Sequence, residues 1–330
     1  MGMNNQLLGK FRLAGSLPKW VGLDTSVAGP LIGLLLLCVV LTVSTHSFLT
    51  VSNLLNVLDQ VTVLGIMALG MTLVILIGGI DLSVGAVLAV AIMAMSWLGQ
   101  VVGLPMWVAM LGAILVGAAC GSTTALLVVK AGLPSFIATL AMMSVARGLA
   151  YMVTDGAQIS GFPEWFSNLS VIRYAGVLSL TVGCFVVLAL LFWFVLRFTV
   201  AGRSLYAIGG SSKVAKLAGI RVKAYTSAVY IISGVCAALG GIIMTSRLDT
   251  AGAGAGVGYE LDVIAAVVIG GGSLKGGAGS VVGTLIGVLI IGVLRNGLNL
   301  AGISPFVQQV VIGAVIAFAV MLDLLKRNPD

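Results

Sequence analysis

The chain has 330 residues, of which 60% are hydrophobic and only 8% are charged. A soluble domain carries about 25% charged residues, so this composition excludes a water-soluble globular protein and indicates an integral membrane protein. The net charge of +7 comes from basic residues that are spread over many segments, which argues against a nucleic-acid-binding surface.

A membrane-spanning helix needs roughly 20 mostly apolar residues. The apolar stretches predict an all-α, polytopic membrane protein with about ten membrane-embedded helices, at residues 29–45, 61–77, 82–98, 105–129, 135–153, 175–196, 226–246, 261–272, 279–300 and 305–325. Pro30 would occupy the first position of the first helix. We therefore expect a membrane domain at 29–325 between an N-terminal tail at 1–28 and a C-terminal tail at 326–330.

Basic residues indicate how these helices are oriented. With the N-terminus in the cytoplasm and ten crossings, only Arg173 and Arg247 fall in outer loops. The cytoplasmic side receives Lys10, Arg12, Lys19, Lys130, Arg197, Arg203, Lys213, Lys216, Arg221, Lys223, Lys275, Lys326 and Arg327. This asymmetry follows the positive-inside rule and predicts that both termini are cytoplasmic.

The longest charged break in the sequence is the segment 197–225, and it lies on the predicted cytoplasmic side. Within it, residues 214–217 predict a short amphipathic helix that ends at Gly219. A structured helix in place of a minimal turn suggests that a soluble protein docks there and drives the membrane domain. The candidate coupling residues are Arg203, Lys213, Ala215, Lys216, Leu217 and Gly219.

Two glycine-rich breaks interrupt the apolar pattern inside the membrane domain. In the first, at 78–85, Asp81 is expected to cap the following helix by accepting from the N–H of Ser83 or Val84. The alternative is that Asp81 and Ser83 shape a gate, since a carboxylate in hydrocarbon costs about 2.5–3.5 kcal/mol and is usually functional.

The second break, at 258–280, contains Glu260 and Asp262 before a short apolar segment. It predicts a broken or half-length helix, which often lines a transport cavity; a plain short span with both acids in the outer loop is the alternative. Gly279, Gly283 and Gly287 follow at a spacing of four, which indicates close helix packing.

Few polar groups lie inside the predicted spans. Arg295, Asn296 and Asn299 are predicted to share one helical face, where amides could bond a neutral polyol. Arg147 and Arg295 are better interpreted as structural anchors that bond backbone carbonyls. The four cysteines lie in apolar spans without a CxxC pair, so we expect buried thiols.

No catalytic constellation, metal-ligand set or nucleotide-binding loop is present in the sequence. We therefore expect no catalytic residue, no metal and no cofactor bound by this chain, and energy for any transport must come from a partner or from an ion gradient.

Four motifs, at residues 67–89, 134–156, 202–222 and 258–287, together resemble the permeases of bacterial ABC importers for sugars, most closely the ribose type. The resemblance covers about 49–323. It implies two permease copies around a pathway in the bacterial inner membrane, a cytoplasmic ATPase that binds ATP and Mg²⁺ and docks on 202–222, and a periplasmic sugar-binding protein. Asp81, Ser83, Glu260, Asp262, Asn296 and Asn299 are the candidate gate or pathway residues.

Other functions remain open at this point. A gradient-driven secondary transporter would use a buried acid such as Asp81, and a passive channel would conduct without partners. Within the ABC permeases, autoinducer-2 and branched-chain amino acids are alternative substrates.

Overall fold

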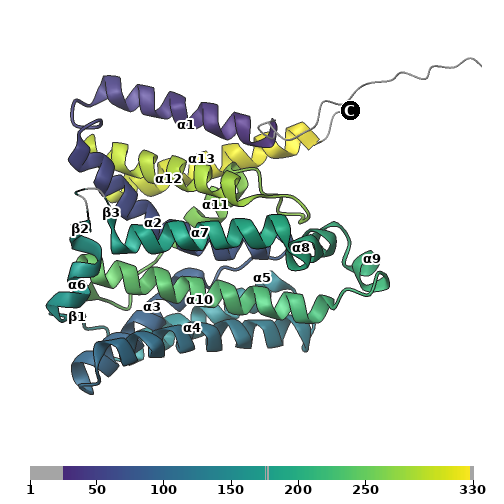
Figure 1. Ribbon diagram of the computed structural model, residues 1–330, viewed down its shortest axis with the longest axis horizontal. Helices are drawn as coiled ribbons and strands as arrows, with labels where there is room; N and C mark the ends of the chain where they lie inside the picture. The colour runs from purple at the N-terminus through teal and green to yellow at the C-terminus, as the bar shows by residue number, and fades with distance from the viewer. Residues whose placement is uncertain (1–24, 175, 177, 328–330) are drawn as a thin grey trace, which may run out of the picture.

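The computed structural model describes residues 25–174, 176 and 178–327, which form mainly long helices that lie side by side (Figure 1). Ten helices correspond to the ten predicted segments: α1 (Thr25–Ser44), α2 (Val51–Leu76), α3 (Val84–Ser96), α4 (Met106–Val129), α5 (Ser135–Met152), α7 (Leu180–Phe198), α10 (Val222–Leu248), α11 (Tyr259–Ile269), α12 (Val281–Leu300) and α13 (Pro305–Arg327). The prediction of an all-α polytopic membrane protein is confirmed.

Most of these helices are long enough to cross a bilayer. Among the described residues, eight helices are sufficiently long and apolar, counting α3 together with the π-helical turn η1 (Trp97–Val101) that continues it. Helix α13 has 23 residues, a length that also spans. Helix α11 has only 11 residues and is too short to cross.

Apart from α11, the short elements gather at the two ends of the long helices (Figure 1). One end, called the α9 end here, carries α8 (Val200–Gly210) and α9 (Ser212–Leu217). The opposite end, the α6 end, carries α6 (Glu164–Val171) and two antiparallel strand pairs, which are β1 (Ile159–Ser160) with β4 (Thr250–Ala251), and β2 (Arg173–Tyr174) with β3 (Leu178–Ser179).

Four predicted helix starts were wrong by at least four residues, those of α1, α2, α7 and α10. Helix α2 begins ten residues before the predicted 61, because Asn53 and Asp59 are buried against protein partners and need no water. Helix α1 begins at Thr25, so Pro30 lies inside the helix and not at its first position. Residues 1–24 and 328–330 of the predicted tails lie outside the described residues.

Helices α2, α3 and α10 form the centre of the molecule. From Val57 to Leu76, most residues of α2 are buried, as expected for a helix that is apolar on all sides. Gly117 of α4 and Gly234 of α10 lie against each other's carbonyl groups, so a side chain at either position would collide with backbone. Small residues thus allow the backbones of α4 and α10 to approach closely.

Candidate functional site

The first glycine-rich break separates α2 from α3 and is organised by Asp81, which is only 3% exposed. Its Oδ1 accepts from the Ser83 N–H at 2.9 Å and from Ser83 Oγ at 2.6 Å. Its Oδ2 accepts from Ser233 Oγ of α10 at 2.8 Å. The predicted bond to the Ser83 N–H is confirmed, and Asp81 also ties the break to α10. Neither Asp81 nor Ser83 borders the cavities described below, so a gating role for them stays a prediction.

We expect Asp81→Ala and Asp81→Asn to behave very differently. Alanine leaves three buried donors without their acceptor, each costing about 1–3 kcal/mol, so little folded protein should be recovered. Asparagine can still accept from Ser83, and its amide can donate to Ser233 Oγ. Asp81→Asn should therefore retain most transport activity, measured as uptake in vesicles after the folded fraction is quantified by size-exclusion chromatography. Complete loss of uptake in well-folded Asp81→Asn would instead indicate that the carboxylate carries a proton or an ion.

The second break contains the short helix α11. It follows Gly258, whose φ is +85°, and it ends at Gly270 before a turn that leads to α12. At Gly287, α12 lies against the carbonyl of Ala266, so α11 and α12 touch through backbone. The prediction of a half-length helix is confirmed, and the alternative with both acids in an outer loop is wrong because Glu260 and Asp262 lie in the first turn of α11.

An ion pair joins the start of α11 to α12. Arg295 Nη2 lies 2.5 Å from Asp262 Oδ2, with the arginine side chain 33% exposed and the aspartate 5% exposed. The guanidinium also lies 5.7 Å from the centre of the Tyr259 ring, within cation–π distance. Arg295 was predicted to bond carbonyls, and this was wrong because a carboxylate lies within reach. The same prediction is confirmed for Arg147, which donates to Ala253 O at 2.6 Å and Ala255 O at 2.8 Å.

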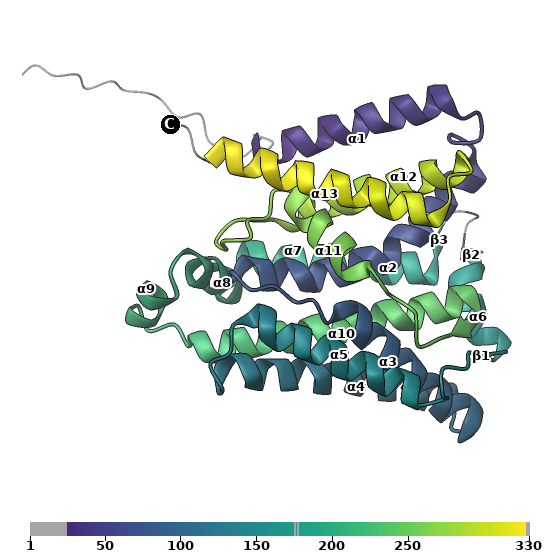
Figure 2. The same ribbon diagram turned by 180° about the vertical axis from the view of Figure 1, so that it is seen from behind.

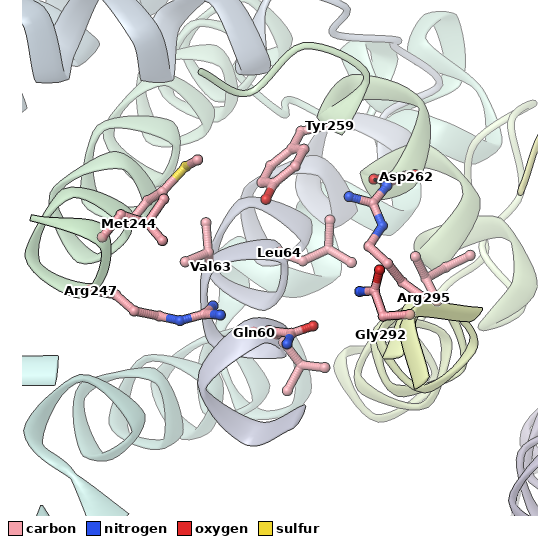
Figure 3. Close-up of a pocket in the computed structure, with 13 residues that line it drawn as sticks. Gln60, Val63, Leu64, Met244, Arg247, Tyr259, Asp262, Gly292 and Arg295 are labelled. Atoms are coloured by element: carbon pink, nitrogen blue, oxygen red, sulfur yellow. Dashed lines mark hydrogen bonds and ion pairs between the residues drawn. The ribbon is translucent and has the colours of Figure 1, made fainter. Parts of the chain in front are cut away.

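Two cavities lie on either side of this ion pair, so Asp262 and Arg295 line both. The first, of about 270 Å³, lies between α2, α10, α11 and α12, and its polar lining residues are Gln60, Arg247, Tyr259, Asp262, Arg295 and Asn299 (Figure 3). The second, of about 360 Å³, lies between α11, α12 and α13, and its polar lining residues are Glu260, Asp262, Arg295, Gln308 and Gln309. Of the predicted pathway residues, the structure thus brings Glu260, Asp262 and Asn299 to these cavities.

Asn296, another predicted pathway residue, does not line either cavity. It is buried and exchanges hydrogen bonds of 3.0 and 2.8 Å with Asn53 of α2. The predicted common face of Arg295, Asn296 and Asn299 was therefore wrong for Asn296, because consecutive residues of a helix point about 100° apart. Sequence reasoning missed Gln60, Arg247, Tyr259 and Gln308 as cavity residues. The adjacent glutamines at 308 and 309, followed by an apolar stretch that extends to residue 322, were the clearest signal available.

The basic segment forms α8 and α9, which project from the α9 end (Figure 1). Helix α9 stops near Gly219, whose φ is +81°, as predicted. Arg203, Lys213, Lys216 and Leu217 are exposed, but Ala215 is only 2% exposed. Ala215 therefore cannot contact a docked protein as predicted, since α9 places it on the face turned toward the rest of the chain. Leu217 is 88% and Val214 63% exposed, so these two form the apolar surface of α9.

Helix α8 contacts the second glycine-rich break and the end of α2 just before the first break. Tyr206 Oη donates to the carbonyl of Gly279 at 2.8 Å, just before α12. Gly209 lies against the carbonyl of Leu76, the last residue of α2, and that carbonyl also accepts from the N–H of Gly277 at 2.9 Å. A displacement of α8 would therefore press directly on the end of α2 and on the turn between α11 and α12.

Comparisons with known proteins agree with this architecture. Residues 53–320 match the family described as branched-chain amino acid transport system / permease component. The chain is 44% identical over 302 residues to the ribose import permease protein RbsC of Escherichia coli K12, covering 90% of this chain and 93% of the relative. It is 46% identical over 309 residues to RbsC of Bacillus subtilis, covering 90% and 92%.

More distant relatives are also permeases. The chain is 33% identical over 295 residues to the L-arabinose ABC transporter permease protein AraH of Azospirillum brasilense, covering 89% of this chain and 86% of the relative. No solved structure matches the chain. With its ten membrane-embedded helices and the similarity that covers nine-tenths of its length, the chain belongs to the permease family of ATP-binding-cassette importers that includes the ribose import permeases.

Proposed function

We propose that this chain imports a monosaccharide, with a pentose such as ribose as the first candidate, across a bacterial inner membrane. The observation that carries the proposal is the 44–46% identity to ribose import permeases over nine-tenths of the chain. In this assembly a partner ATPase binds ATP and Mg²⁺, and a periplasmic binding protein delivers the sugar. The chain itself acts as the conduit and not as an enzyme.

We infer that the α9 end is cytoplasmic and the α6 end is periplasmic. The alternating course of the helices gathers Lys130, Arg197, Lys223 and Lys275 at the α9 end with the exposed lysines of α9, whereas Arg173 and Arg247 lie toward the α6 end. Such a distribution favours a cytoplasmic α9 end and cytoplasmic termini. The ATPase would then dock on α8 and α9.

A second copy of the chain would complete the pathway. Helices α5, α11 and α13 lie on one side of the molecule (Figure 2). This side exposes Gln309, leaves Glu260 partly exposed, and carries the cavity between α11 and α13. Ionisable and amide groups at membrane depth seldom face lipid and usually face protein or a water-filled cavity. These positions support a homodimer in which two such faces enclose the route of the sugar.

Reconstitution would test this function. The purified chain, its ATPase and its binding protein would be placed in sealed proteoliposomes, and uptake of radiolabelled D-ribose, L-arabinose and L-leucine would be compared with and without ATP. We expect ATP-dependent uptake of a pentose that requires all three components. Uptake driven by an ion gradient without ATP, conduction by the chain alone, or selective uptake of leucine would overturn the proposal in favour of the corresponding alternative.

A further inference from the structure

Two polar side chains that line the cavity between α2, α10, α11 and α12 are not hydrogen-bonded to any described residue. Gln60 of α2 and Arg247 of α10 both point into it (Figure 3). Within residues 25–174, 176 and 178–327, neither side chain makes a hydrogen bond or an ion pair. Half-buried polar groups that converge on a space without satisfying one another are the usual mark of a binding site.

Both hydrogen-bond donors and hydrogen-bond acceptors line this cavity. Arg247 and the Asn299 amide offer donors, since among the described residues Asn299 uses only its Oδ1, which accepts from Gln308 at 2.7 Å. Asp262 Oδ1 is an acceptor, because only Oδ2 bonds Arg295. Gln60 and the Tyr259 hydroxyl supply both. A sugar hydroxyl donates and accepts at once and suits this mixture, whereas phosphate is an anion that mainly accepts hydrogen bonds and would lie against the negative carboxylate of Asp262.

The rest of the lining suits the carbon skeleton of a sugar. Val61, Leu64 and Ile291 provide apolar walls, and Gly292 leaves room where a side chain would collide with Val61. The volume of about 270 Å³ is close to the lower limit of small-molecule pockets, roughly 300 Å³, which favours a single sugar ring over an oligosaccharide.

We propose that this cavity is a monosaccharide-binding site of the permease itself, in which Gln60, Arg247 and Tyr259 bind the ring hydroxyls. The proposal rests on the sugar-import function. It adds that each copy of the chain has a sugar-binding site of its own. The Asp262–Arg295 ion pair separates this site from the cavity between α11 and α13, so the site adjoins the proposed route without being part of the face between the two copies.

Direct binding tests this site without the partner proteins. The full-length chain in nanodiscs would be titrated with radiolabelled D-ribose in equilibrium dialysis, with no ATPase and no binding protein present. We expect saturable binding that inorganic phosphate does not displace. Arg247→Gln should weaken it at least 10-fold, and Gln60→Leu and Tyr259→Phe about 3- to 10-fold each. Gln100→Leu, the same change at a glutamine of η1 outside the cavity, should have no effect.

Several results would overturn this site. They are an absence of saturable sugar binding, displacement of the sugar by phosphate, or unchanged affinity in Arg247→Gln and Gln60→Leu variants whose thermal midpoints match the unsubstituted protein. Import assays separate this inference from the proposed function. ATP-driven ribose import with an unchanged KM in both variants would leave the function intact and remove the site, whereas ribose binding without any ATP-driven import would retain the site and remove the function.

Discussion

Replacing Arg295 with methionine should destabilise the protein and abolish import. The substitution removes the partner of Asp262, which is 5% exposed and would be left as an uncompensated carboxylate between two helices. Breaking a fully buried pair in this way costs about 3–5 kcal/mol, and because Arg295 is one-third exposed we expect about 2–3 kcal/mol. The thermal midpoint of the detergent-solubilised protein should fall by several degrees.

Comparison with related variants separates the ion pair from a general effect of losing an arginine. Arg247→Met is the matched control, because Arg247 lines the same cavity and has no carboxylate partner among the described residues, and its thermal midpoint should be unchanged. Asp262→Leu should cost less than Arg295→Met, since the freed guanidinium can turn toward water. The double variant, Asp262→Leu with Arg295→Met, should recover most of the stability.

Import by the double variant then distinguishes structure from function. If the pair only fastens α11 to α12, restored stability should restore ATP-driven uptake. We expect uptake by the double variant to remain low. The ion pair lines both cavities, so the double variant removes its polar groups from both of them. A normal thermal midpoint in Arg295→Met would contradict the assigned ion pair altogether.

Hydropathy predicted the helices well because lipid imposes one requirement on every span, an apolar stretch of sufficient length. The hydropathy prediction failed where polar residues of a helix are surrounded by protein and not by lipid. The first turns of α2 carry Asn53 and Asp59, which a hydropathy window treats as a loop, but Asn296 and Arg173 satisfy them inside the fold. Such partners are far away in the sequence, so the start of α2 could not be predicted.

The sequence predicted which segments contribute to the candidate site, but not which of their side chains pair with each other. Glycines and acids at two breaks indicated irregular backbone inside the membrane domain, and both breaks are present. The pairing of Arg295 with Asp262 depends on how α11 lies against α12, which spacing alone does not specify. Likewise, six residues of α9 are too few for periodicity to determine which of Ala215 and Leu217 faces outward.

The exposed surface of α9 leads to the other large expected effect. Val214 and Leu217 lie three residues apart on α9, 63% and 88% exposed, beside Lys213 and Lys216. At the α9 end, an apolar pair bordered by charge is typical of a docking surface. If the ATPase docks there, Leu217→Asp should reduce its association at least 10-fold, measured by co-purification and by surface plasmon resonance in detergent, and should reduce ATP-driven uptake in parallel.

A second substitution on the same helix controls for charge. Ser212→Asp adds the same negative charge at an exposed position in the first turn of α9, where the helix dipole favours it, and should leave association unchanged. Ala215→Asp is unsuitable as a test, because a buried aspartate would disrupt α9 itself. Full ATPase association with Leu217→Asp would mean that the ATPase docks elsewhere. Lost association would instead place the ATPase beside α8, whose Tyr206 and Gly209 contact the turn before α12 and the end of α2.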